Sequence, residues 1–150
     1  MLAAALAVAA LNAVPALLGA WLWYWGEASA SAARAFWIAL RVGQGAALVL
    51  VLVVASLAVA GKHPREGLFY LYALLPIAVA LIAEQLRVAS AQTVLDQRGL
   101  AGAQAVGQLP EEEQRGLVAE IVRREIGVMA TSALVVVFLA LRAASTAHGF

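Results

Sequence analysis

The residues most able to do chemistry are charged and amide side chains set into otherwise apolar stretches. Glu84, Gln85 and Arg87 follow the apolar run PIAVALIA, and Arg41 and Gln44 lie near the beginning of another apolar run. A charge within or at the edge of a membrane helix is costly, so such residues commonly form pairs or serve a function. Together these groups are suited to hold an ion, an anionic headgroup or a quinone head, or to carry a proton.

Helical geometry predicts that Arg41 and Glu84 lie at the same depth. Arg41 is about 8 Å from a predicted span start at Phe36. Glu84 is about 24 Å from a predicted span start at Leu68, along a hydrocarbon core of about 30 Å. Because a short loop joins these two spans, both side chains fall near the same membrane face. We therefore expect an Arg41–Glu84 ion pair, which relieves both desolvation costs.

A fourth apolar run brings two further charged residues to this level. The predicted polar layer comprises Arg41, Gln44, Glu84, Gln85, Arg87, Arg124 and Glu125. Two interpretations stay open: the charges only fix helix register and snorkel to the headgroups, or they line a pocket open to the cytoplasm. Asn12, in the middle of the first apolar run, is suited to bond a neighbouring helix or to extend a proton path.

The sequence lacks the patterns of the common catalytic and cofactor sites. Both histidines, His63 and His148, lie outside the apolar runs, where they cannot ligate haem inside a bundle. There is no cysteine, no Glu-x-x-His or His-Glu-x-x-His motif and no glycine-rich phosphate loop. We therefore expect no metal, no cofactor and no enzymatic activity. The net charge of +1 suggests no nucleic-acid partner.

Composition identifies the elements that must position the polar layer. Of 150 residues, 64% are hydrophobic and 13% charged, and both values depart from soluble domains toward membrane proteins. Four runs are long enough to span a bilayer, at about 2–25, 36–60, 68–90 and 124–142. We predict an all-α fold, a single integral membrane domain built as a four-transmembrane-helix bundle.

The connections between the spans differ in length and character. Residues 26–35 and 61–67 are predicted to be short polar links, and residues 99–109 a flexible turn. Helical character continues past residue 90, and Pro110 followed by three glutamates favours a helix start. We expect a helical hairpin over 91–123, with a loosely ordered loop as the alternative. A signal peptide cleaved near Ala28-Ser29-Ala30 is a second alternative, which the missing basic segment before the first run disfavours.

The distribution of basic residues predicts the orientation. Arginines concentrate on the side of 26–35 and 91–123, so the positive-inside rule places these segments in the cytoplasm and both termini outside. We expect a multi-pass protein of a bacterial plasma membrane, surrounded by lipid and by other membrane subunits or further copies of itself.

Three functions fit this sequence. The first is a non-catalytic accessory, assembly or interaction subunit of a membrane complex, because small residues line the helices and no chemistry is evident. The second is a small oligomeric transporter or channel that uses Arg41, Gln44 and Glu84. The third is a lipid- or quinone-binding redox auxiliary.

Overall fold

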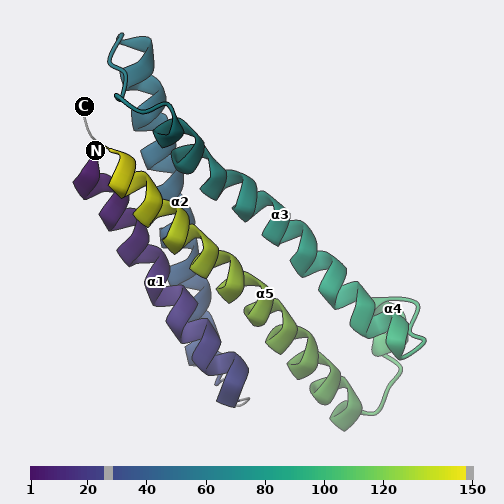
Figure 1. The fold of residues 1–150 in the computed structure, drawn as a ribbon. Helices are drawn as coiled ribbons and strands as arrows, with labels where there is room; N and C mark the ends of the chain where they lie inside the picture. Colours follow the sequence, from purple (N-terminus) through teal and green to yellow (C-terminus); the bar gives the residue numbers. More distant parts are fainter. Residues whose placement is uncertain (26–28, 148–150) are drawn as a thin grey trace.

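Four long helices dominate the computed structural model, which describes residues 1–25 and 29–147. They are α1 (Leu2–Trp25), α2 (Ala30–Val59), α3 (Leu68–Gln97) and α5 (Glu111–Thr146), and a one-turn helix, α4 (Ala103–Val106), precedes α5 (Figure 1). The described part contains no strand, and each long helix is long and apolar enough to cross a membrane. The prediction of an all-α chain with four membrane-length helices is confirmed.

The long helices form a bundle in which α5 is the shared partner of α1 and α3. It packs along both of them, whereas α2 packs against α1 and less extensively against α3. Across the bundle, α2 and α5 barely touch. Figure 1 shows α3 and α5 side by side as they extend away from the end where α1 begins and α5 ends. Because α5 packs along α1, the first and last long helices of the bundle are neighbours.

The helix boundaries confirm that the third helix extends past residue 90 and correct two predicted connections. Helix α3 continues without interruption to Gln97, as expected. Helix α2 begins at Ala30, because the Ser29 hydroxyl accepts a hydrogen bond from the backbone N–H of Ala32, 3.2 Å away. The predicted polar link of 26–35 is therefore wrong for residues 30–35. The predicted flexible turn contains α4, and Ala28 of the predicted cleavage triplet lies outside the described residues.

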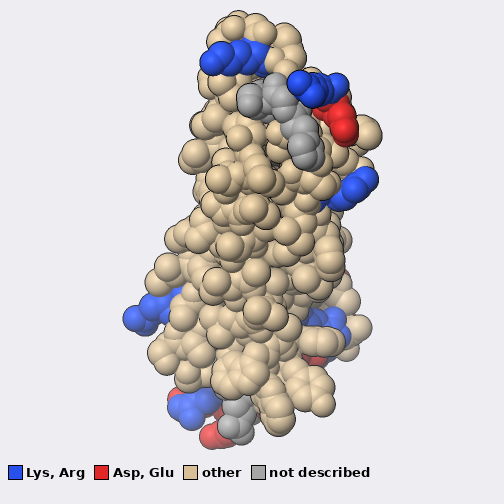
Figure 2. Space-filling view, turned by 60° about the vertical axis from the view of Figure 1, so that its left-hand side comes forward, with Lys and Arg blue, Asp and Glu red and all other residues tan. Residues whose placement is uncertain are grey.

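Charged side chains gather toward the two ends of the molecule and leave an uncharged band between them (Figure 2). On α5 this band separates Glu125 from Arg142, about 26 Å at the helical rise. That length matches a hydrocarbon core of about 30 Å. The band is therefore compatible with a transmembrane bundle.

Gly19 allows three helices to meet at one point. A methyl group built on Gly19 of α1 would lie 2.5 Å from a ring carbon of Phe36 on α2 and 2.6 Å from the Cβ of Ala130 on α5. Phe36 is fully buried, so its ring has no room to retreat. In lipid, such close backbone approach replaces the hydrophobic effect as the force that holds helices together.

We predict that Gly19→Ala destabilises the bundle by about 1–3 kcal/mol, because the added methyl overpacks this junction. Gly45→Ala is the matched control: Gly45 is also helical, but nothing lies within 4 Å of its added Cβ. The control should be neutral or stabilising by about 0.5–1 kcal/mol. Unfolding in mixed micelles, followed by circular dichroism, measures both values. Equal stability of the two variants would contradict this account of the junction.

Candidate functional site

The predicted ion pair between Arg41 and Glu84 is present at one end of the uncharged band. Nη1 of Arg41, on α2, lies 2.7 Å from Oε1 of Glu84, on α3. The same nitrogen donates to Oε1 of Gln44, also at 2.7 Å and one turn away on α2. Gln44 thereby holds the guanidinium in place for the carboxylate.

A second arginine extends this pair to α5. Nε of Arg87 lies 3.1 Å from the other carboxylate oxygen of Glu84, and its Nη1 lies 3.9 Å from Oε2 of Glu125. The guanidinium also lies over the Trp37 ring, 5.3 Å from the centroid. The Arg87 Nε–H is buried and not aligned for a hydrogen bond, so its attraction to Glu84 is that of charges alone. The four residues Arg41, Glu84, Arg87 and Glu125 form an ion-pair chain across α2, α3 and α5.

Gln44 is hydrogen-bonded to this chain, whereas two other residues of the predicted polar layer make no ion pair or side-chain hydrogen bond with it within the described residues. Gln85 is exposed and makes no side-chain hydrogen bond within the described residues. Arg124 has no carboxylate within ion-pairing distance in the described part and instead borders a groove between α1, α3 and α5. The reason is rotation: consecutive helical residues point about 100° apart, so Glu84 and Glu125 face the chain and their neighbours do not.

Asn12 joins α1 to α2 in the middle of the bundle. Its side chain is buried, and Nδ2 donates to the carbonyl oxygens of Val8, at 2.9 Å, and of Gly43, at 3.1 Å. Gly43 permits this contact, because a Cβ there would lie 2.8 Å from the Asn12 carbonyl oxygen. Of the two roles considered for Asn12, this geometry matches the interhelical bond.

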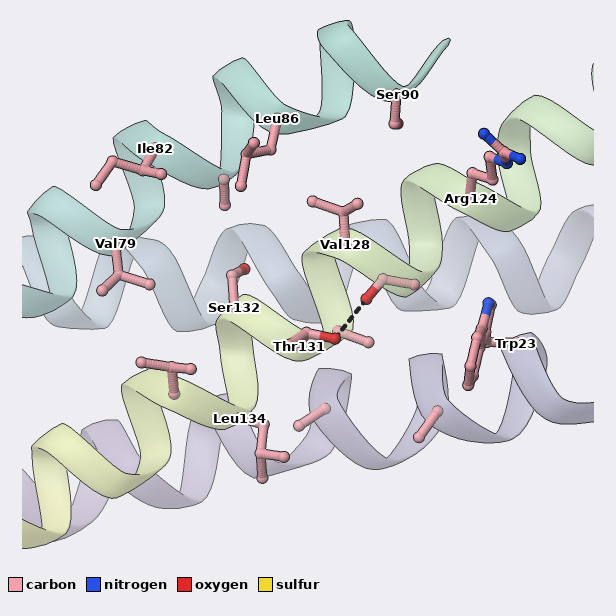
Figure 3. Close-up of a pocket in the computed structure, with 16 residues that line it drawn as sticks. Trp23, Val79, Ile82, Leu86, Ser90, Arg124, Val128, Thr131, Ser132 and Leu134 are labelled. Atoms are coloured by element: carbon pink, nitrogen blue, oxygen red, sulfur yellow. Dashed lines mark hydrogen bonds between the residues drawn. The ribbon is translucent and has the colours of Figure 1, made fainter. Parts of the chain in front are cut away.

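A lateral groove of about 750 Å³ opens on the outer face of α5. α5 forms its floor, and α3 and α1 form its walls (Figure 3). The groove is lined by Ala16, Ala20 and Trp23 of α1, by Val79, Ile82, Ala83, Leu86 and Ser90 of α3, and by Arg124, Gly127, Val128, Ala130, Thr131, Ser132, Leu134 and Val135 of α5. This surface is almost wholly apolar, and its one charged residue, Arg124, lies at one end.

This lateral groove is not predicted from the sequence, although residues that line it show a recognisable pattern. The residues of each wall recur at helical spacing, for example Ala16, Ala20 and Trp23 on α1. Small residues on α5 recess the floor, and the indole of Trp23 lies over Gly127, so that an added Cβ would meet it at 3.0 Å. Such spacing equally suits a packed core, so only the arrangement of the three helices reveals the groove.

A second, more open hollow of about 800 Å³ lies beside Arg41, between Arg34, Trp37 and Val122. Glu84 lines neither hollow. The described residues contain no cluster of three histidine or acidic side chains that could hold a metal. No family model, curated protein or solved structure matches this chain.

We predict unequal coupling within the ion-pair chain. The Arg41 side chain is 55% exposed and that of Arg87 30%, against the same carboxylate. Solvent screening therefore weakens the Arg41–Glu84 pair more. We expect a coupling free energy of about 0.2–1 kcal/mol for Arg41–Glu84 and of about 1–2 kcal/mol for Arg87–Glu84. Double-mutant cycles with Glu84→Gln and either Arg41→Gln or Arg87→Gln, read out by unfolding in micelles, measure both energies. A larger coupling for Arg41 would refute this ranking.

Proposed function

We propose that this chain is a non-catalytic subunit of a membrane complex, which binds its partner through the hairpin formed by α3 and α5. The observation that carries the proposal is the projection of this hairpin beyond α1. Nε of Arg123, on α5, donates to the backbone carbonyl of Trp23 at 3.0 Å and so marks the end of α1. Helix α5 begins twelve residues before Arg123, at Glu111, about 18 Å further out.

The two helices of the hairpin hold each other beyond the bundle. Nη2 of Arg98, which caps the C-terminus of α3, pairs with Oε2 of Glu120 on α5 at 2.8 Å. Val94 of α3 and Leu117 of α5 are buried, and neither belongs to the hydrophobic clusters of the bundle. A projecting arm that is braced by both apolar packing and an ion pair offers a partner a preformed surface, which lowers the ordering cost of binding.

The outer face of this arm carries an uncharged patch. Gly116, Val118 and Ala119 are exposed on α5, among the charged side chains of its first four turns. Val118 is the large hydrophobic side chain among them and is 53% exposed. We take this uncharged patch as the centre of the contact with a partner subunit or a second copy of the chain.

The ion-pair chain supports a structural role rather than transport. A proton-carrying carboxylate needs an oxygen that faces a pathway, whereas each oxygen of Glu84 lies against an arginine. For this reason the transporter alternative receives less support than the assembly function.

We predict that Val118→Asp reduces complex assembly, because it places a charge in the uncharged patch. Native gel electrophoresis of the protein extracted in mild detergent should show the wild type well above its mass of 15.6 kDa and the variant shifted toward it. Gln97→Asp, which adds the same charge at the end of α3, is the control and should leave the complex intact. A wild type that migrates as a lone monomer would overturn the proposal.

We further propose that the hairpin is cytoplasmic and both termini lie outside, in a plasma membrane, as the distribution of arginines indicates. The cysteine-free sequence makes this directly testable. In intact cells, Lys62→Cys in the loop between α2 and α3 should react with a membrane-impermeant thiol reagent. Gln97→Cys should react only after permeabilisation. The reverse pattern would invert the topology.

A further inference from the structure

We propose that the lateral groove binds one acyl chain of an anionic phospholipid, with Arg124 holding the lipid phosphate. The proposal is independent of the hairpin and of any partner subunit. From Arg124 to Val135 the floor of the groove extends over eleven residues, about 17 Å. That is about half of a hydrocarbon core of about 30 Å, the depth of a single leaflet.

The polar groups of the groove are arranged for a molecule with one polar end. The hydroxyls of Ser90, Thr131 and Ser132 donate to carbonyls of their own helices, at 2.7, 2.9 and 2.8 Å. The walls therefore offer few free donors along their length. The remaining donors are the Arg124 guanidinium and the Trp23 indole N–H, whose nitrogen points toward the end where Arg124 lies (Figure 3). An acyl chain fits the apolar length and a phosphate fits the donor end.

Charge complementarity selects an anionic headgroup. Arg124 has no carboxylate partner within the described residues, although two carboxylates, Glu84 and Glu125, belong to the same layer. Both of those are engaged by Arg41 and Arg87. A phosphate beside Arg124 would therefore be paired, whereas the ammonium group of a zwitterionic lipid would meet no free carboxylate there. The groove should favour a lipid of net negative charge.

The test compares lipid retention by three variants. The wild type and each variant are reconstituted in equal amounts of phosphatidylglycerol and phosphatidylcholine, extracted in mild detergent and analysed by native mass spectrometry. The wild type should retain one phosphatidylglycerol per chain. Arg124→Gln should lower the ratio of bound phosphatidylglycerol to phosphatidylcholine about fivefold, the loss expected for one basic side chain facing an anionic headgroup.

Two further variants separate the groove from general surface charge. Arg34→Gln removes an exposed arginine of α2, which does not line the groove, and should leave the ratio unchanged. Thr131→Phe fills the floor and should reduce the retention of both lipids. Equal retention of the two lipids by the wild type, or equal effects of Arg124→Gln and Arg34→Gln, would overturn the proposal. So would a co-purified quinone, or a partner helix crosslinked in the groove.

Discussion

The ion-pair chain from Arg41 through Glu84 and Arg87 to Glu125 is the constraint on which the arrangement of this bundle depends. Helices in lipid gain little from burying apolar surface against one another, so apolar packing alone tolerates sliding along the helix axes. An ion pair at the edge of the hydrocarbon resists such sliding, because separating it leaves both charges poorly solvated. One connected chain therefore fixes the relative depth of α2, α3 and α5. Helix α1, which has no charge, is fixed instead by Asn12 and by its terminal contact with Arg123.

The position of each polar residue along its helix could be predicted from the sequence. The direction in which its side chain points around the helix could not. Span lengths and the shared depth of Arg41 and Glu84 follow from hydropathy and the helical rise, which act along one dimension. The directions of Gln85 and Arg124 depend on how neighbouring helices pack. Arg124 consequently belongs to the lateral groove, although the sequence places it in the same layer as Glu125.

The small residues that allow close packing of the helices also create the lateral groove. Small residues let α1 and α5 approach closely at Gly19, and small residues of α5, Ala130 among them, also leave its surface low between α1 and α3. Closer approach of α1 to α3 would close the groove, but α5 lies between them. Helix α5, with two neighbours and one exposed surface of small residues, thus both holds the bundle together and leaves a concave face.

The pairing of α1 with α5 has a consequence for biosynthesis. Helix α1 leaves the ribosome before α5, yet α5 is the most extensive packing partner of α1. Until α5 has been synthesised, α2 is therefore the main packing partner that α1 has. Its uncharged length suits it to persist alone in lipid, since a helix that satisfies its own backbone hydrogen bonds needs no neighbour there. The contact between α1 and α5 forms only after α5 has been synthesised.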